Sequence, residues 1–129
     1  MRSDGPVLAA FTRGDASFVE AHLSAEPGIL GVGTDPEEWY EGAEVRRIFT
    51  EQLTAMGGVS ITPGDVRAYQ EGPVGWIADR PTFTFTDGAT FSVRFTAVAR
   101  REDGGWKLVQ AHTSVGVPNE QVVGQDLPT

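Results

Sequence analysis

The hydrophobic period of this chain changes once, near its middle, and that change limits the possible folds more than any other feature. Between positions 43 and 56 the apolar residues recur at helical spacing, which predicts an amphipathic helix with the stripe Val45, Ile48, Phe49, Leu53 and Met56. From Val59 onward apolar and polar residues alternate with a period of two, as in half-buried strands. Because helical and strand signals are segregated, the pattern favours an α+β domain over an alternating α/β domain.

The second half of the chain predicts four antiparallel strands joined by short turns, over residues 59–71, 74–86, 89–101 and 106–115. Asp87-Gly88 is a strong hairpin signal between the second and third strands. Pro63 predicts an edge or a bulge in the first, because proline donates no ladder hydrogen bond. Ahead of the long helix we expect two shorter helices, separated at Gly14, and a short strand over residues 29–33.

Length and charge set the broad class of the protein. The 129 residues suffice for one domain with a buried core, which we expect over residues 1–117, followed by a flexible polar tail over 118–129. The net charge of −8 argues against nucleic-acid binding, since an acidic chain repels phosphates. Arg46-Arg47 and Arg100-Arg101 are the basic pairs, and both are interpreted as solvated faces.

Several other classes of site lack support in the sequence. The chain has no cysteine, which removes disulfides, thiolate nucleophiles and zinc–thiolate clusters. Its two histidines, His22 and His112, have no carboxylate pair at ligand spacing, and no Gly-x-Gly-x-x-Gly motif opens a helix, so we expect neither a metal nor a nucleotide cofactor. No apolar run approaches the length of a membrane span and no secretory signal opens the chain, so a cytoplasmic, non-membrane protein is expected.

Three segments in a fixed order carry a family resemblance: Arg13-Gly14-Asp15, the stretch Gly33-Thr34-Asp35-Pro36-Glu37-Glu38-Trp39-Tyr40-Glu41-Gly42, and Gly105-Trp106-Lys107-Leu108-Val109-Gln110-Ala111-His112-Thr113-Ser114. Together they resemble the nuclear transport factor 2-like superfamily, and within it the SnoaL-like group, over nearly the whole chain. The resemblance implies a cone-shaped fold in which N-terminal helices pack on a curved antiparallel sheet around an apolar pocket. It also implies a homodimer formed through the outer face of that sheet.

The same resemblance implies two alternative functions. The superfamily includes ketosteroid isomerase, polyketide cyclases and dehydratases, together with non-catalytic transport and assembly domains. The chain is therefore expected to bind a small apolar or polyketide- or steroid-like molecule, with acid–base chemistry of the isomerase, cyclase or dehydratase type. The alternative is a non-catalytic dimerisation or ligand-sensing module, and the sequence does not decide whether the protein is an enzyme. Steroid isomerase activity is disfavoured because residues 7–10 contain no tyrosine and residues 94–98 no acid.

Asp35 and His112 are the candidate catalytic residues. Asp35 precedes the long helix, and the resemblance places it near the position where ketosteroid isomerase carries its general base. A carboxylate in an apolar pocket could accept a proton. The alternative is that Asp35-Pro36 simply begins a turn. His112 could exchange protons near neutral pH, or could be structural. A Ser114–His112–Asp35 triad is disfavoured, because alternate residues of a strand lie about 6–7 Å apart.

The candidate ligand-binding residues are Trp39, Tyr40, Trp76, Phe95 and Thr113. Trp39 and Trp76 would supply flat surfaces for a ligand and Tyr40 a polar group, although the same rings could equally plug the open end of the cone. Strict alternation on the last strand places two sets of residues on opposite faces, and either set could face the pocket. One set is Trp106, Leu108, Gln110, His112 and Ser114; the other includes Ala111 and Thr113.

Overall fold

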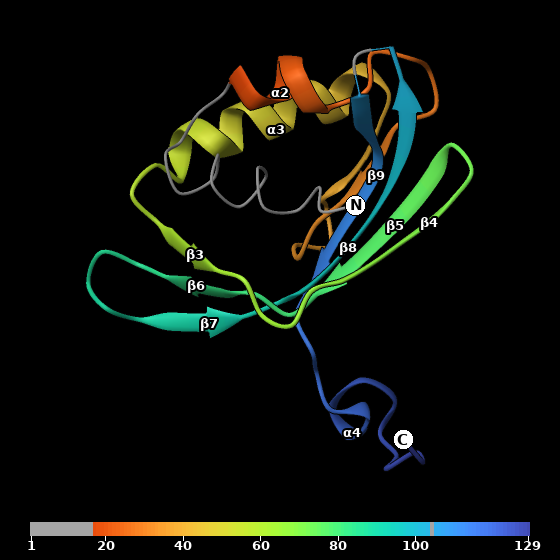
Figure 1. Ribbon diagram of the computed structural model, residues 1–129. Helices are drawn as coiled ribbons and strands as arrows, with labels where there is room; N and C mark the ends of the chain where they lie inside the picture. The colour runs from red at the N-terminus through yellow and green to blue at the C-terminus, as the bar shows by residue number, and fades with distance from the viewer. Residues whose placement is uncertain (1–16, 104) are drawn as a thin grey trace.

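The structure, a computed structural model, describes residues 17–103 and 105–129, except for the side chain of Phe18. The expected first helix and the Arg13-Gly14-Asp15 segment lie outside these residues. The described elements are α2 (Ser17–His22), β1 (Leu30–Val32), β2 (Trp39–Glu41), α3 (Ala43–Ala55), β3 (Ser60–Thr62), β4 (Arg67–Glu71), β5 (Val74–Asp79), β6 (Thr82–Thr84), β7 (Thr90–Ser92), β8 (Arg94–Glu102), β9 (Gly105–Ser114) and α4 (Asn119–Val123) (Figure 1).

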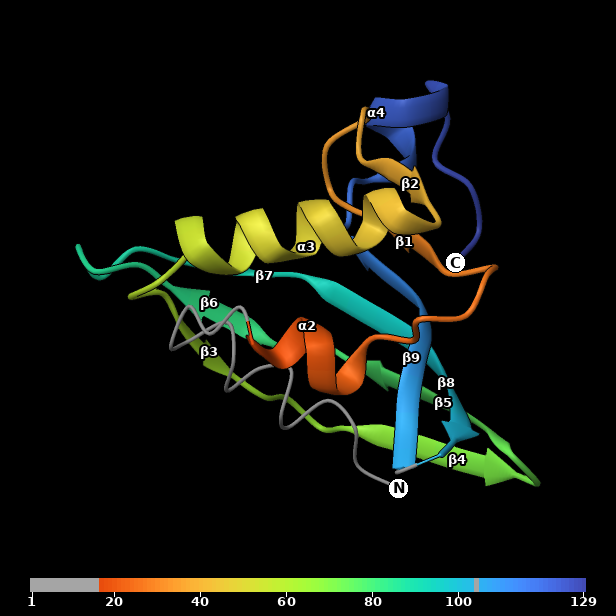
Figure 2. The same cartoon turned by 90° about the horizontal axis from the view of Figure 1, so that it is seen from above.

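Helix α3 occupies the segment that the apolar stripe predicted. It begins after Gly42, whose φ of 63° is readily adopted only by a residue without a side chain, and its chain leaves through Gly58 at φ 101°. Val45 and Leu53, two members of the stripe, are buried against the rest of the fold. Figure 2 shows α3 and α2 lying side by side over the strands, so the two helices form one layer and the sheets the other.

The strands form two sheets rather than one meander. The larger has the order β2-β1-β9-β8-β5-β4 and the smaller the order β3-β6-β7. Three of the long strands expected from the sequence are each divided between them, at Pro63-Gly64, at Arg80-Pro81 and at Val93. All neighbouring strands are antiparallel except β1 and β9, which pair in parallel, so the larger sheet is mixed. The smaller sheet extends to one side beneath α3 (Figure 1).

A buried carboxylate holds the junction between the two sheets. Asp79 is only 6% exposed, and its Oδ1 accepts hydrogen bonds from the backbone N–H groups of Gly64, at 3.1 Å, and Arg80, at 2.8 Å. These two donors lie where the chain leaves one sheet for the other, so they have no ladder partner of their own. Gly64 approaches so closely that a Cβ there would lie 2.6 Å from the Arg80 carbonyl oxygen. The junction between the two sheets therefore requires both the Asp79 carboxylate and a glycine at position 64.

A β-bulge in β9 changes which of its residues face inward. Val98 pairs with Gln110 and Ala99 with Leu108, which leaves Val109 as the extra residue. Strict alternation was therefore wrong for this strand. Leu108 is buried on the same side as Ala111, whereas Gln110 is exposed.

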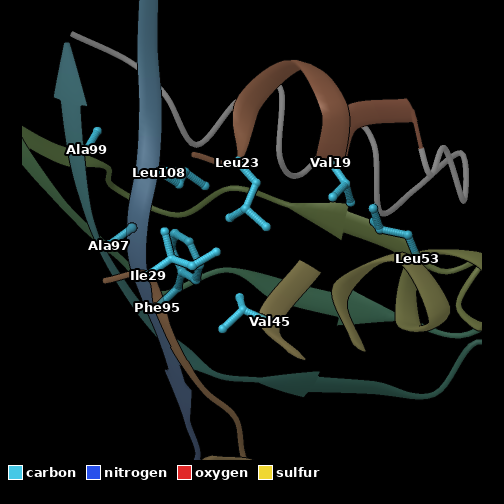
Figure 3. Close-up of a cluster of buried hydrophobic side chains, with 9 residues drawn as sticks. All are labelled: Val19, Leu23, Ile29, Val45, Leu53, Phe95, Ala97, Ala99 and Leu108. Carbon is cyan, nitrogen blue, oxygen red and sulfur yellow. The ribbon is translucent and has the colours of Figure 1, made fainter. Parts of the chain in front are cut away.

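The main core lies between the helix layer and the inner face of the larger sheet. Its buried members come from both helices, from the segment that joins α2 to β1, and from the central strands β8 and β9 (Figure 3). They are Val19, Leu23, Ile29, Val45, Leu53, Phe95, Ala97, Ala99 and Leu108. A second, smaller cluster between the end of α3 and the smaller sheet contains Val59 and Ile61, with Met56 and Phe83 packed against it.

Arg46 and Arg47 have different roles, although the sequence suggested a common solvated face. The Arg46 guanidinium donates to the backbone carbonyl oxygens of Val19, Leu23 and Ser24, at 2.8, 3.0 and 2.9 Å, and so fastens the end of α2 to α3. Arg47 is exposed and forms ion pairs along its own helix. The interpretation of both as solvated was therefore wrong for Arg46.

A hydrogen bond between Ser24 and Glu102 connects the segment after α2 to the end of β8. It makes the stability of the fold depend on pH. Ser24 is fully buried and its hydroxyl donates to Glu102 Oε2 at 2.7 Å. This hydrogen bond, with a smaller contribution from Arg100, lowers the pKa of the Glu102 carboxyl. A depressed acid pKa stabilises the fold at pH values above the unfolded-state pKa, and this stabilisation is lost as pH falls through the folded-state value.

Glu102→Gln is expected to lower the free energy of unfolding by about 1 kcal/mol at pH 7, with the difference shrinking as the pH is lowered below about 4.5. Urea unfolding of both proteins at several pH values measures this. Glu71→Gln, at an exposed position of β4, is the control and should change little. A loss from Glu102→Gln that stayed constant down to acidic pH would contradict the assignment of the pKa shift.

After β9 the chain forms a short helix that stands apart from the sheets. None of the residues of α4 is buried, and Figure 1 shows it beyond the end of β9. The expected boundary of the domain at residue 117 falls just before this helix. Within residues 17–103 and 105–129, no helix combines the length and apolarity that a bilayer span requires.

Candidate functional site

A cavity of about 240 Å³ lies between α3 and the inner faces of both sheets. Its walls are mainly apolar side chains from α3, from the smaller sheet and from β8 and β9. The apolar lining residues are Val32, Val45, Ile48, Phe49, Met56, Pro81, Phe83, Phe91, Val93, Phe95 and Ala111, with Gly31 and Gly33. A largely apolar concavity with a few polar groups is the usual form of a small-molecule site.

The polar lining groups are Thr34, Glu38, Tyr40, Gln52 and Thr113. Glu38 is the one carboxylate among the described lining residues, and two donors fix its position. Its Oε1 accepts a hydrogen bond from the backbone N–H of Asp35 at 2.8 Å, and its Oε2 accepts one from Gln52 Nε2 at 2.6 Å. A carboxylate has about four lone-pair directions, so both oxygens keep the capacity to accept from a ligand.

Gly33 provides the space that the Glu38 side chain occupies. A Cβ at Gly33 would lie 2.7 Å from the Glu38 carboxyl carbon and 2.9 Å from its Cβ. The backbone N–H of Gly33 also donates to the Glu38 carbonyl oxygen at 2.9 Å. The glycine is therefore needed for this placement of the carboxylate.

Tyr40 reaches the cavity from β2, where it pairs with Gly31 of β1. Burial raises the pKa of its phenol, and the negative charges of Glu38, Glu44 and Asp35 raise it further, against a small opposing effect of Arg47. The hydroxyl thus stays protonated at neutral pH and can act as a donor. It has no hydrogen-bond partner among the described residues.

Asp35 lies in the turn before β2 and outside the cavity lining. Its side chain is exposed and Oδ1 accepts a hydrogen bond from the backbone N–H of Glu37 at 2.9 Å, which is the geometry of an Asx turn. The sequence left open whether Asp35 faces the pocket or begins a turn, and the structure places its carboxylate in the turn. Its contact with the site is through its backbone N–H, which holds Glu38.

The other predicted residues divide between the two faces of the sheet. Phe95 and Thr113 line the cavity together with Tyr40. Trp39 is 68% exposed, and His112 lies on the outer face, where it pairs with Thr96. Trp76 is also on the outer face, with its ring stacked on Tyr69 at 6.1 Å. The structure therefore brings three of the predicted residues together and leaves Asp35, Trp39, Trp76 and His112 outside.

Glu38 and Gln52 were not singled out by the sequence analysis. Gln52 carries a recognisable signal, since it lies four residues after Ile48 and four before Met56, as a polar residue inside the apolar stripe of α3. Glu38 carries none, because Asp35, Glu37 and Glu41 surround it in the sequence. Within the described ranges, histidine and acidic side chains form no group of three that could hold a metal ion.

The fold is similar to several solved structures. A nuclear transport factor 2-like protein of unknown function from Pseudomonas putida KT2440 superposes with a TM-score of 0.79 at 15% identity, covering 97% of this chain and 88% of that one. A candidate dehydratase of the same family from Streptomyces avermitilis gives 0.76 at 21% identity, covering 89% and 91%. A candidate ketosteroid isomerase from Shewanella frigidimarina gives 0.71 at 18% identity, covering 87% and 91%. At these identities the likeness establishes the fold alone.

These likenesses confirm the predicted α+β cone fold of the nuclear transport factor 2-like type. Among curated proteins, none matches the sequence. Residues 6–118 match the family model of the SnoaL-like domain, which is most of the chain. The protein therefore belongs to the SnoaL-like family, as the three sequence segments predicted.

Proposed function

We propose that this chain binds a small, largely apolar molecule in the cavity beneath α3, and that Glu38 accepts a hydrogen bond or a proton from it. The observation that carries the proposal is the contrast within the cavity. Its walls are mainly apolar, and the one carboxylate in the described lining is held in place by two donors. Such a site buries the body of a ligand by the hydrophobic effect and orients it through the polar group.

Acid–base chemistry of the isomerase, cyclase or dehydratase type would use Glu38 as proton acceptor and Tyr40 as donor. A fixed carboxylate and a protonated phenol that line the same cavity suit removal of a proton beside a polarised carbonyl group. Asp35 would then act through Glu38, as a positioning residue, since its backbone N–H holds Glu38 Oε1. The non-catalytic alternative uses the same groups only to orient a ligand.

The cavity volume favours a compact ligand. At about 240 Å³ it lies below the range of roughly 300–1,000 Å³ that is typical of sites for drug-sized molecules. A molecule of one or two rings suits this space better than a four-ring steroid. This agrees with the argument from sequence against steroid isomerase activity.

The binding test is titration of the isotopically labelled protein with 2-naphthol, a neutral two-ring probe, followed by amide chemical shifts. Amides of Gly31, Gly33 and Thr113 are expected to shift in the wild-type protein. Ala111→Phe, which fills the cavity from β9, is expected to abolish these shifts. Ala55→Phe adds the same ring at an exposed position of α3 and should leave them unchanged.

Native mass spectrometry of the purified protein adds a second readout. It detects any small molecule that co-purifies with the protein, and denaturation releases that molecule so that its mass can be measured. Shifts that persist in Ala111→Phe, or their absence from the wild-type protein together with no retained compound, would contradict the proposal. A retained compound that is released chemically unchanged after prolonged incubation favours the non-catalytic alternative over the enzyme.

We also propose that the outer face of the larger sheet pairs with that of a second copy. Two adjacent cross-strand rows on this face, Tyr69–Trp76–Val98–Gln110 and Ala78–Thr96–His112, carry aromatic, aliphatic and neutral polar side chains. Two chains of net charge −8 repel, and these two rows carry no acidic residue, whereas Glu41 and Glu71 lie on the edge strands β2 and β4. The centre of the face is therefore the surface on which a self-complementary contact has least opposition. Sedimentation equilibrium should give the dimer mass, and Trp76→Arg should give the monomer. A wild-type monomer at high micromolar concentration would exclude this contact.

A further inference from the structure

We propose that the ligand of the cavity is a compact aromatic amine that binds as its ammonium ion, with the ammonium group at Glu38, and that the cavity rejects anions. This inference rests on the proposed binding function and names the class of ligand. It follows from the charge, the wall chemistry and the size of the cavity, taken in turn.

The described lining of the cavity carries a negative charge and no positive charge. Among the described lining residues there is no lysine, arginine or histidine, and Glu38 is the one charged group. The arginines of α3 are committed elsewhere, since Arg46 binds the end of α2 and Arg47 forms ion pairs with Glu44 and Glu51. A ligand carboxylate or phosphate would therefore enter without a partner, at a large cost in desolvation.

Further carboxylates act on the Glu38 end of the cavity. Burial is the largest cause of the raised pKa of the Tyr40 phenol, and the carboxylates of Glu38, Glu44 and Asp35 raise it further, against a smaller opposing effect of Arg47, so a net negative field reaches the lining. Apolar walls reduce screening by water and strengthen such fields. A positive group is attracted to this end of the cavity and a negative one is repelled.

The walls of the cavity favour a ligand that contains an aromatic ring system. Phe83 and Phe91 lie 5.0 Å apart between ring centroids, and Phe49 and Phe95 also line the cavity. Ring faces pack against an aromatic ligand and attract a nearby cation. Because the volume is about 240 Å³, the ligand is limited to one or two rings with a short side chain.

Glu38 is also built to receive a donor. Gln52 and the backbone of Asp35 each supply one hydrogen bond, to different oxygens, so the carboxylate is oriented but not saturated. An ammonium group has three donors and no acceptor, and therefore matches the remaining lone pairs. A charge-assisted hydrogen bond inside an apolar cavity is stronger than a neutral one.

The test compares three ligands with one ring system and different charge: 2-(2-naphthyl)ethylamine, 2-(2-naphthyl)ethanol and 2-naphthylacetate, by calorimetry at pH 7. We expect the amine to bind at least tenfold more tightly than the alcohol, and the acid at least tenfold more weakly. Glu38→Gln should remove the advantage of the amine while changing the alcohol by less than about threefold. Glu37→Gln makes the same change of charge at an exposed neighbour and should preserve the advantage.

Gly33→Ala provides a second variant that keeps every charge. The added Cβ collides with the Glu38 side chain and displaces the carboxylate, so the advantage of the amine should fall at least fivefold. Alcohol and amine binding equally, or the acid binding most tightly, would overturn this inference and leave the proposed function standing. Failure of all three ligands to bind would instead count against the proposed function itself.

Discussion

Arg46→Met is expected to lower the free energy of unfolding by about 2–4 kcal/mol, because three backbone carbonyl groups lose their shared donor. The guanidinium reaches all three from one side chain, at distances of 2.8–3.0 Å. Met keeps an unbranched stem of similar length and offers no N–H group. Arg46→Lys is expected to recover only part of the loss, since one ammonium cannot match the planar fork of the arginine. Urea unfolding followed by circular dichroism measures all three proteins.

Arg47→Met is the matched control for this prediction. It removes the adjacent arginine of the same helix, whose partners Glu44 and Glu51 are at least half exposed. Ion pairs of this kind contribute about 0–1 kcal/mol. Equal losses from the two variants would show that the attachment of α2 contributes no more than a surface ion pair.

Asp79→Ala is expected to destabilise the protein by about 2–4 kcal/mol, through the junction of the two sheets. The substitution leaves the N–H groups of Gly64 and Arg80 without their acceptor in a site where the carboxylate is only 6% exposed. Asp79→Asn is expected to lose less, because one oxygen, Oδ1, serves both donors and an amide oxygen can replace it. Thermal and urea unfolding provide the comparison.

Asp87→Ala tests whether the effect belongs to the junction. Asp87 also accepts a backbone hydrogen bond, from Ala89 N at 2.9 Å, but on the exposed turn between β6 and β7. Its removal should cost less than about 1 kcal/mol, since water replaces the lost acceptor. If Asp79→Ala were no more harmful than Asp87→Ala, the two sheets would not depend on the carboxylate.

The sequence predicted most reliably the features that local spacing determines. The stripe from Val45 to Met56 and the glycines beside it specify α3, because helical period and chain termination are local properties. The strand segments were also predicted, but not their division into two sheets. That division depends on the hydrogen bond from the Gly64 N–H to the Asp79 carboxylate, fifteen residues later in the chain. A local sequence pattern does not reveal such a contact. The three-residue strand β2 was missed because it is too short to show a period.

Of the residues that the sequence analysis put forward for the site, only some lie at the cavity. Tyr40, Phe95 and Thr113 line the cavity. The direction of His112 depends on the bulge at Val109, and that of Asp35 on a turn that its own carboxylate closes. Glu38 enters the cavity because Gly33 leaves room for it, which is a contact between residues and not a pattern in the sequence.

The smaller of the two apolar clusters supports one wall of the cavity. Met56 and Phe83 line the cavity but pack with the small cluster of Val59 and Ile61. Substitutions there alter the shape of the cavity while the larger cluster between the helices and β8 and β9 is untouched. Changes in a few side chains can therefore reshape the cavity with little effect on the main core.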